Sequence, residues 1–342
     1  MGRKNKNYSI DLHQQAYNKL TAMQAFGESK KQAIENGTDK DKIFSFNTYK
    51  TYWKHIKYFT KWIQDNHPEC TTLKAARKHI NEWLQTRVDQ ELSAWTIQTE
   101  AKALGKLYGI QPDDPDYFQP PKRRRQDIKR SRVDAERDRH FSITNNDEFI
   151  KFCKGVGGRR AAIEKLKADD LWSRSEMEEE LRKAEMGKGI IIGDGDENVI
   201  ENIKDALKVF PDQDYFIHFV RDKGGRSRFS PIVGKNKQQI IERMENTPSG
   251  EKVWQRVPKN ADIHSYRGDY ATYIYKQYAR KIEEIPYDKI NKGTGKAYQS
   301  GVYVCRKDES GKKLDKEAML ICSKALGHNR LEVVANNYIR GL

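Results

Sequence analysis

Apolar side chains recur at three- and four-residue steps through much of residues 8–110, which is the spacing of amphipathic helices. In the segment TYKTYWKHIKYFTKWI at 48–63, an apolar stripe lies opposite a face of lysines. We therefore expect one face of this helix to pack and the other to be basic. The stripe consists of Tyr49, Tyr52, Trp53, Ile56, Phe59 and Ile63, and the basic face of Lys50, Lys54, Lys57 and Lys61.

Two further segments repeat this arrangement. In TTLKAARKHINEWL at 71–84, Thr71 or Thr72 is suited to cap the start of a helix. In SAWTIQTEAKALGKLYG at 93–109, the final glycine is suited to end one. The three helical segments together predict a helical first domain over residues 1–110.

The pattern changes in residues 111–140, where prolines are followed by a dense cluster of arginines. This composition predicts an interdomain linker. Its run Lys122, Arg123, Arg124 and Arg125 is consistent with a solvated charge run, a localisation signal or a strap against phosphates, and we favour the strap. The prolines are Pro112, Pro115, Pro120 and Pro121.

Residues 141–342 show a mixed pattern, which predicts a second, α/β domain. An FIHFVRDKGGRSRFSPIVG segment is typical of a β-hairpin turning at Gly224-Gly225. The whole chain is thus expected to be mainly α-helical with a small antiparallel β-sheet. The expected elements are helices at 145–154 and 159–168, strands near 215–220 and 228–233, and further helices after them.

Charge narrows the class of partner. The 342 residues include 64 Lys and Arg against 49 Asp and Glu, a net charge of +15. This excess favours a polyanion, and because it is spread along the whole chain we expect a nucleic-acid backbone contacted over a long path. A merely soluble basic protein is the alternative. The 36% of hydrophobic residues is enough to bury the cores of two domains.

The four cysteines, Cys70, Cys153, Cys305 and Cys322, have no CxxC spacing and indicate neither a zinc site nor a disulfide framework. We interpret them as reduced, intracellular thiols. The segment MGRKNKNYSID lacks the apolar core of a signal peptide, and no run approaches the roughly 18 apolar residues of a membrane span. The expected location is the cytoplasm, with the protein associated with the nucleoid when bound to DNA and with no membrane partner.

Several short motifs carry candidate chemistry. Arg159 follows a flexible Gly-Gly at a predicted helix start, and His264 and Arg267 share one face of a helix because they lie three apart. ALGHNR contains His328, and Tyr338 follows it. Each motif alone is more typical of a surface pair or a helix end. Their order along the chain, with Lys223 in the hairpin between them, is far more specific.

In that order, GGR, DKGGRSRFSPI, His-x-x-Arg, Leu-Gly-His and the tyrosine resemble the tyrosine recombinase, or phage integrase, family. The specific motifs cover roughly residues 150–342. The resemblance implies a SAM-like helical core-binding domain and a mixed α/β catalytic domain that form a C-shaped clamp around double-stranded DNA. It also implies a monomer or dimer that becomes a homotetramer at synapsis, accessory DNA-bending proteins, and integration or excision of a mobile genetic element through a Holliday junction.

The resemblance implies a DNA strand transferase that needs no metal, cofactor or ATP. Arginines would meet the charge that develops on a five-coordinate phosphorus, with His328 adding a hydrogen bond. Tyr338 would attack to form a 3′-phosphotyrosyl link, His264 would accept its proton, and Lys223 would donate one to the departing 5′ oxygen. The implied catalytic residues are Arg159, Lys223, His264, Arg267, His328 and Tyr338, with Arg159 preferred to Arg160.

Some features depart from the family pattern. Ala162 stands where the family often has an acidic residue, residues 172–214 and 285–317 are enlarged, and only a short segment follows Tyr338, so we expect another element to couple the subunits. The second enlargement is expected to form a loop or small hairpin near the DNA. The residues expected to contact DNA are Lys50, Lys54, Lys57, Lys61, Lys122, Arg123, Arg124, Arg125, Arg226 and Arg228.

Two other classes of function remain open at this point. A type IB topoisomerase uses the same residue types to relax DNA as a monomer. A non-catalytic DNA-binding regulator on the same fold would be expected to have lost part of the set, whereas all six positions here carry usable residues.

Overall fold

The computed structural model describes residues 11–123, 141–187, 198–220, 222, 227–306, 309–328 and 330–339. The chain divides into two compact units, Met1–Arg130 and Ser131–Leu342, and this boundary falls within the predicted linker. The described part is mainly helical with small antiparallel sheets, which confirms the predicted class. None of its helices is both long enough and apolar enough to cross a membrane.

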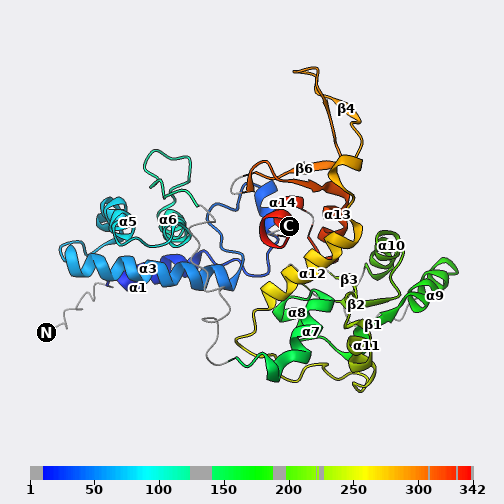
Figure 1. The fold of residues 1–342 in the computed structure, drawn as a ribbon. Coiled ribbons are helices and arrows are strands. Elements are labelled where there is room, and N and C mark those ends of the chain that lie inside the picture. Colours follow the sequence, from blue (N-terminus) through cyan, green and yellow to red (C-terminus); the bar gives the residue numbers. More distant parts are fainter. Residues whose placement is uncertain are drawn as a thin grey trace. The chain divides into compact units, whose positions relative to one another are not determined.

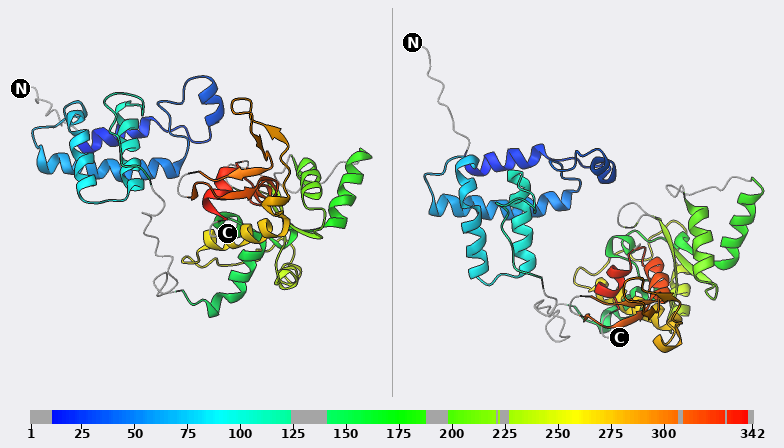
Figure 2. Two further views of the ribbon diagram at one scale, coloured as in Figure 1. Left: turned by 45° about the horizontal axis from the view of Figure 1, so that its top comes forward. Right: turned by 90° about the horizontal axis from the view of Figure 1, so that it is seen from above.

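The N-terminal unit consists of helices around one apolar core. Helix α1 lies alongside α3, and α5 and α6 cross them (Figure 2). The predicted apolar stripe is confirmed, since Ile56, Phe59 and Ile63 have no exposed surface. The elements are α1 (Leu12–Ala22), α2 (Lys30–Glu35), α3 (Phe46–Asn66), α4 (Leu73–Ala76), the 3₁₀ turn η1 (Arg77–His79), α5 (Ile80–Asp89) and α6 (Ala94–Tyr108).

The other two predicted helices of this unit differ in their outcome. Gly109 ends α6 in the left-handed conformation, with φ of 71°, as its position predicts. The segment at 71–84 is not one helix, because η1 separates α4 from α5. Thr72 nevertheless caps α4 by accepting a hydrogen bond from the Ala75 amide. The periodicity therefore identified the buried positions but not the break.

The C-terminal unit combines helices with a three-stranded antiparallel sheet in the order β1-β2-β3 (Figure 1). The predicted strand pair is confirmed as β2 and β3. Its helices are α7 (Asp147–Val156), α8 (Arg160–Ile163), α9 (Arg174–Glu185), α10 (Val199–Val209), α11 (Lys237–Glu245), α12 (Ile263–Tyr278), α13 (Lys316–Ala325) and α14 (Leu331–Asn337). Its strands are β1 (Leu171–Ser173), β2 (Tyr215–Phe219), β3 (Arg228–Pro231), β4 (Lys289–Ile290), β5 (Ala297–Tyr298), β6 (Val302–Val304) and β7 (Lys313–Asp315), and its 3₁₀ turns are η3 (Thr144–Asn146), η4 (Ala168–Asp170) and η5 (Ile282–Glu284).

The predicted helix at 159–168 is shorter than expected. It forms only α8 and is followed by η4, although its inward residues Ile163 and Leu166 are both buried. Helix α12 lies at the centre of the unit, packed against α7 on one side and α13 on the other. The buried side chains of α12 include Arg267 and Tyr270, which are among the largest fully buried side chains of the described chain.

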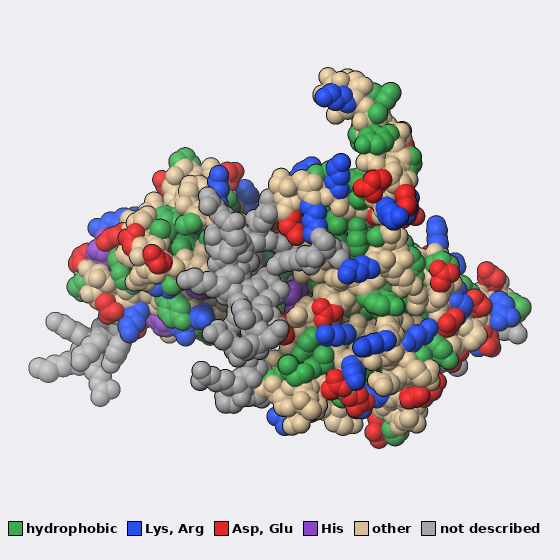
Figure 3. Space-filling model, viewed as in Figure 1, with side chains coloured by type: hydrophobic (Ala, Val, Ile, Leu, Met, Phe, Trp, Pro, Cys, Tyr) green, Lys and Arg blue, Asp and Glu red, His purple; other side chains and the backbone are tan. Residues whose placement is uncertain are grey.

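The two enlarged regions form recognisable elements. The first contains the charged helix α9 and the amphipathic α10. The second contains the β4–β5 hairpin, which stands away from the body of its unit (Figures 1 and 3). Its strands are exposed, and residues 289–298, KINKGTGKAY, carry lysines and no acidic residue. This agrees with the expectation of a small hairpin, whereas its contact with DNA stays a prediction.

A glycine ends α7 for a reason that the structure makes explicit. Gly157 has φ of 61°, which side chains on L residues rarely adopt. A Cβ at this position would lie 2.3 Å from the ring of the fully buried Tyr270. Both the backbone conformation and the packing therefore require glycine.

We predict that Gly157→Ala lowers the free energy of unfolding by about 2–5 kcal/mol, because left-handed strain and overpacking add. Gly187→Ala is the matched control: its φ is 68° but nothing lies within 4 Å of its Cβ position, so only the strain of about 1–2 kcal/mol applies. Chemical denaturation of both variants measures the difference. Equal losses in the two would show that Tyr270 does not restrict this site.

Candidate active site

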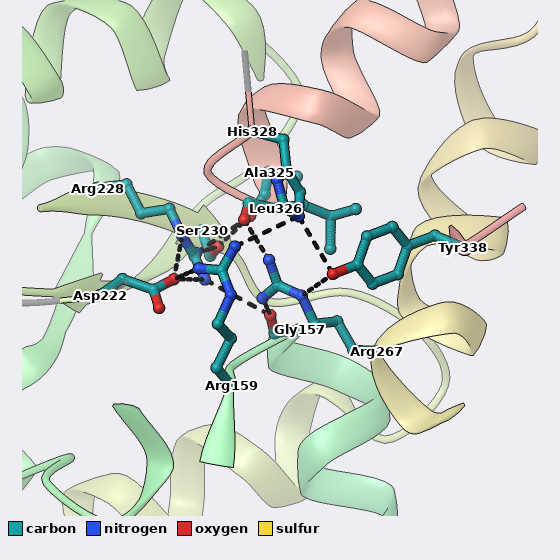
Figure 4. A network of polar contacts seen from close by, with 10 residues as sticks. All are labelled: Gly157, Arg159, Asp222, Arg228, Ser230, Arg267, Ala325, Leu326, His328 and Tyr338. Carbon is teal, nitrogen blue, oxygen red and sulfur yellow. Dashed lines mark hydrogen bonds and ion pairs between the residues drawn. The ribbon is translucent and has the colours of Figure 1, made fainter. Parts of the chain in front are cut away.

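Four predicted catalytic side chains come together although they are widely separated in the sequence (Figure 4). Arg159 lies between α7 and α8, and Arg267 lies in the first turns of α12. His328 follows the end of α13, and Tyr338 follows the last residue of α14. Helix α12 supplies the central position, and the helices packed around it bring the others to it.

The hydroxyl of Tyr338 is the meeting point of this group. The Nε of Arg267 donates a hydrogen bond to it at 3.4 Å, and Nε2 of His328 lies 3.1 Å away. The ring of His264 contacts the ring of Tyr338, with centroids 5.1 Å apart. Tyr338 is only 8% exposed, so its hydroxyl is presented to these side chains and not to bulk water.

The proton positions around this hydroxyl follow from donor chemistry. An Nη2 atom of Arg159 lies 3.3 Å from the same Nε2 of His328. Because a guanidinium has no acceptor, Nε2 must carry a lone pair and the proton of the neutral ring lies on Nδ1. Nε2 has one lone pair, so Arg159 and the Tyr338 hydroxyl, 3.1 Å away, share the same acceptor. His328 therefore has an acceptor atom within hydrogen-bond distance of the phenolic hydroxyl.

The positive surroundings of His328 keep it neutral. Burial, together with repulsion from Arg267, Arg159 and Arg228, lowers the pKa of His328 to about 4. Its backbone is fixed as well, because the His328 amide donates to the Ser323 carbonyl at 2.8 Å and the Ser323 hydroxyl donates to the His328 carbonyl at 2.6 Å. The imidazole is therefore held in place and in its neutral form.

Arg267 is 1% exposed, and backbone carbonyls stabilise its charge. Its terminal nitrogens donate to the carbonyls of Gly157 and Leu326. Gly157 is the C-cap of α7 and Leu326 the C-cap of α13. The C-terminal end of a helix has free carbonyls and a partial negative charge, so two helix ends solvate one cation. Burial nonetheless lowers the pKa of Arg267.

Arg228 was expected to contact DNA, but the structure places it inside the unit. Its side chain is buried, with Nη1 donating to the Ser230 hydroxyl and, at 3.0 Å, to the Ala325 carbonyl. Burial, followed by repulsion from Arg267, lowers the pKa of Arg228 to about 9. A guanidinium buried in this way holds its neighbours in position and is not exposed for contact with phosphate.

Asp222 connects two of the arginines. Its Oδ2 accepts from Nη1 of Arg159 and from Nε of Arg228, the latter at 3.3 Å. The side chain of Asp222 is 5% exposed, so this carboxylate is buried with its partners. The acidic support for Arg159, which the family pattern places near Ala162, comes instead from the segment that follows β2. Arg160 faces elsewhere and donates to the carbonyls of Pro258, Lys259 and Ala261.

The charge balance of the network in Figure 4 favours an anion. Arg159, Arg228 and Arg267 are cationic, Asp222 is the one carboxylate drawn with them, and His328 is neutral. Carbonyl dipoles reduce the cost of burying these cations but cancel no net charge. Arg159 keeps 21% of its side chain exposed and can reach a ligand. The kind of group that the cluster would attract is therefore a phosphate that carries one or two negative charges.

The remaining predicted residues have mixed outcomes. Lys50, Lys54, Lys57 and Lys61 are exposed on α3, and Lys122 and Arg123 are exposed as well, with Arg123 5.6 Å from the ring of Trp95. Lys223, Arg124, Arg125 and Arg226 lie outside the described residues. Among the described residues, the group whose side chains are spaced to hold a metal ion is His67, Glu69 and His79 in the N-terminal unit.

Sequence reasoning missed the roles of Asp222, Arg228 and Ser230. One signal was present: residues 228 and 230 are polar and alternate along a strand, so they project from the same face of a sheet that is otherwise apolar. All four residues of β3 are buried. Two polar residues on a buried strand face require partners, and this requirement points to an internal network. The backbone carbonyls that accept from the arginines could not be identified from the sequence, because every residue type has one.

We predict that Asp222→Asn lowers the free energy of unfolding by about 3–5 kcal/mol, because it leaves Arg159 and Arg228 without their buried counterion. Asp205→Asn is the control. Asp205 pairs with Lys324, but both side chains are about half exposed, at 47% and 49%, and surface pairs contribute about 0–1 kcal/mol. Urea denaturation compares the two, and a loss in Asp222→Asn no larger than in the control would contradict a structural role for this carboxylate.

A pH dependence follows from His328. Its folded-state pKa, about 4, lies below the ordinary value of 6.5, so the unfolded chain binds a proton at higher pH than the folded one. The stability that the neutral imidazole contributes is fully present above pH 6.5 and is lost as the pH falls toward 4. We predict that the wild type loses more stability than His328→Gln as the pH falls through this range. A difference that stays constant in denaturation series at several pH values would show that His328 is not held neutral.

Comparison with known proteins finds no family model that matches this chain and no curated protein that matches it. The chemistry of the site is therefore argued from its own residues. These are a buried tyrosine hydroxyl, a neutral imidazole aligned to take its proton, and a set of guanidiniums with one carboxylate among them.

Proposed function

We propose that this protein is a site-specific tyrosine recombinase, an enzyme that cleaves and rejoins DNA through a covalent bond to Tyr338. The observation that carries the proposal is the placement of the Tyr338 hydroxyl between Nε of Arg267 and Nε2 of His328. A nucleophile, a proton acceptor and a fixed cation then meet at one atom. The order of the motifs along the chain, which resembles that family, supports the same conclusion.

The arginines supply what a phosphodiester requires. When an oxygen attacks phosphorus, negative charge accumulates on the nonbridging oxygens, and fixed donors stabilise that state more than the ground state. Arg159 and Arg267 are the donors in this proposal, and Arg228 and Asp222 hold them in position. Loss of one such donor typically costs about 3–4 kcal/mol in transition-state stabilisation. No step of this transfer requires a redox change or a high-energy cofactor.

The bonds and protons balance within the proposed step. The Tyr338 oxygen bonds to phosphorus while the bond from phosphorus to the 5′ oxygen breaks, which leaves a 3′-phosphotyrosyl link. Once a bound phosphate anion offsets the repulsion from the arginines, the phenolic proton passes to Nε2 of His328, and the same nitrogen then donates to a nonbridging oxygen. Lys223 is the proposed donor to the 5′ oxygen. Attack by a 5′ hydroxyl reverses the step and rejoins strands, because the ester to tyrosine keeps the energy of the original bond.

This assignment changes one role that the sequence suggested. His264 was expected to accept the phenolic proton, but its ring contacts the ring of Tyr338, whereas a nitrogen of His328 lies at hydrogen-bond distance from the hydroxyl. His264 then serves to position the tyrosine ring. The distinction predicts different effects of the two histidines on the rate of cleavage.

The remaining parts of the proposal concern DNA and assembly. The exposed lysines of α3 and the basic linker would contact phosphates, so binding would weaken steeply with salt. The helical unit would be the core-binding domain and the second unit the catalytic domain of a clamp around duplex DNA. A homotetramer would exchange one pair of strands and then the other through a Holliday junction, in integration or excision of a mobile element.

The test uses DNA fragments that carry a nick near the cleavage position, so that the short cleaved strand diffuses away and the protein stays attached. We predict that the wild type forms a covalent adduct that survives denaturing electrophoresis. Tyr338→Phe removes only the hydroxyl, and Arg267 keeps its two carbonyl partners, so the variant should fold and bind DNA while the adduct falls by more than about 10⁴-fold. Sequencing the attached DNA would identify the target.

Tyr278→Phe is a matched control, because it also removes one phenolic hydroxyl from the C-terminal unit. Tyr278 is not part of the cluster, so this variant should leave the adduct unchanged. Wild-type protein that binds the sequenced target but forms no adduct would favour the non-catalytic regulator. An adduct accompanied by relaxation of plasmids, without exchange between two target duplexes, would favour the topoisomerase.

A further inference from the structure

A second cluster of chemically active side chains lies in the N-terminal unit, where the end of α3 meets the start of α5. His67 is the C-cap of α3, Glu69 follows it before α4, His79 ends η1, and Glu82 lies in the first turn of α5. The rings of His67 and His79 stack with centroids 3.6 Å apart and planes 23° from parallel. The proposed recombinase function uses none of these residues.

One carboxylate sets the proton positions on both rings. Nε2 of His67 lies 3.3 Å from Oε1 of Glu82, and Nδ1 of His79 lies 2.8 Å from Oε2 of the same residue. An ionised carboxylate accepts hydrogen bonds and donates none, so both of these ring nitrogens carry their hydrogens. In the neutral rings, the opposite nitrogens, Nδ1 of His67 and Nε2 of His79, therefore carry lone pairs.

These two lone pairs have no adequate partner among the described residues. Nε2 of His79 is buried without a hydrogen bond, which costs about 1–3 kcal/mol. Nδ1 of His67 lies 3.7 Å from Oε1 of Glu69, and that carboxylate can only accept. One ligand atom from each of His67, Glu69 and His79 falls within 4.8 Å of the others. Two imidazoles and one carboxylate thus bring ligand atoms close enough together for one cation site.

We propose that His67, His79 and Glu69 bind one divalent transition-metal ion, with Zn²⁺ as the ion that this ligand set favours. Two imidazoles and one carboxylate are zinc ligands, and they are too rich in nitrogen for Mg²⁺ or Ca²⁺. Glu82 is the positioning residue, because a ligating histidine usually donates its other N–H to a carboxylate, which fixes its tautomer. Water or the thiolate of the buried Cys70, whose Sγ lies 3.7 Å from Oε1 of Glu69, completes the coordination.

Small adjustments bring the ligands to bonding distance. Zinc ligands lie about 2.0–2.2 Å from the ion, so the ligand atoms must close to within about 3–4 Å of one another. The side chain of Glu69 is 65% exposed, so its carboxylate has room to turn, and the two stacked rings need to tilt. The ion would tie the C-terminal end of α3 to the start of α5 across the loop that contains α4. This proposal goes beyond the sequence analysis, in which the spacing of the cysteines indicated no zinc site.

The test measures metal binding by the full-length chain, independently of DNA. Protein stripped with a chelator is titrated with Zn²⁺ against a competing indicator dye, and its metal content is measured after dialysis. We expect one equivalent bound and a rise in melting temperature. Glu82→Gln, which keeps the shape but weakens the alignment of both rings, should lower the affinity about 10–100-fold, and His79→Gln and Glu69→Gln at least as much.

His13→Gln is the matched control. His13 belongs to the same unit and bonds to Thr60, but it lies outside the cluster, so its affinity for Zn²⁺ should equal that of the wild type. Glu69→Gln keeps the experiment decisive if a histidine variant fails to fold, because its side chain is 65% exposed. Co²⁺ provides a second readout: the wild type should show the visible absorption of a tetrahedral complex, and Glu69→Gln should lose it.

Either of two results would overturn the proposal. The first is a wild type that binds no Zn²⁺ at micromolar concentration. The second is binding that Glu69→Gln, His79→Gln and His13→Gln leave equally strong, which would place the ion elsewhere on the chain. Neither result would bear on the attack by Tyr338, because that chemistry is assigned to residues of the other unit.

Discussion

The free carbonyls at the ends of α7 and α13 are the constraint on which the C-terminal unit depends. A guanidinium cannot be buried without partners, and here the partners of Arg267 are the last carbonyls of two helices that pack on either side of α12. Glycines follow both helices in the left-handed conformation, at Gly157 and Gly327. The fold therefore builds the cation site from helix ends, and helix packing decides where the cations lie.

Arg228 and Asp222 extend this arrangement to the sheet. A Cβ on Gly327 would lie 2.6 Å from the side chain of Arg228, so the glycine that ends α13 also makes room for this second arginine. Asp222 accepts hydrogen bonds from both Arg228, on strand β3, and Arg159, which lies between α7 and α8. The arginines bind the ends of α7 and α13 and the segment after β2, so their contacts also hold these elements together. Tyr338 joins this structure through its hydroxyl, which contacts Arg267 and His328, and through its ring, which contacts His264.

Periodicity and motif order were sufficient for much of this description, and the physical reasons for the remainder are specific. The helices at α3, α6, α7 and α12 follow from apolar spacing, because burial of one face determines them. The β2–β3 pair follows instead from two short runs on either side of a Gly-Gly pair, since β3 is buried throughout. The same spacing could not locate the break at η1 or the early end of α8, which leave the buried positions almost unchanged. Arg159, Arg267, His328 and Tyr338 were identified from their order. Asp222 was not, because its role depends on a contact between a loop and two arginines that no local pattern records.

The kind of counter-charge that surrounds the arginines has a further consequence. Carboxylates lose their charge in acid, but peptide carbonyls have no proton to gain or lose in water. Since carbonyls are partners of both Arg228 and Arg267, this part of their surroundings does not vary with pH, and a proton gained by His328 in acid only adds to the positive surplus. The dipoles that hold these two arginines therefore act alike in acidic and in neutral solution.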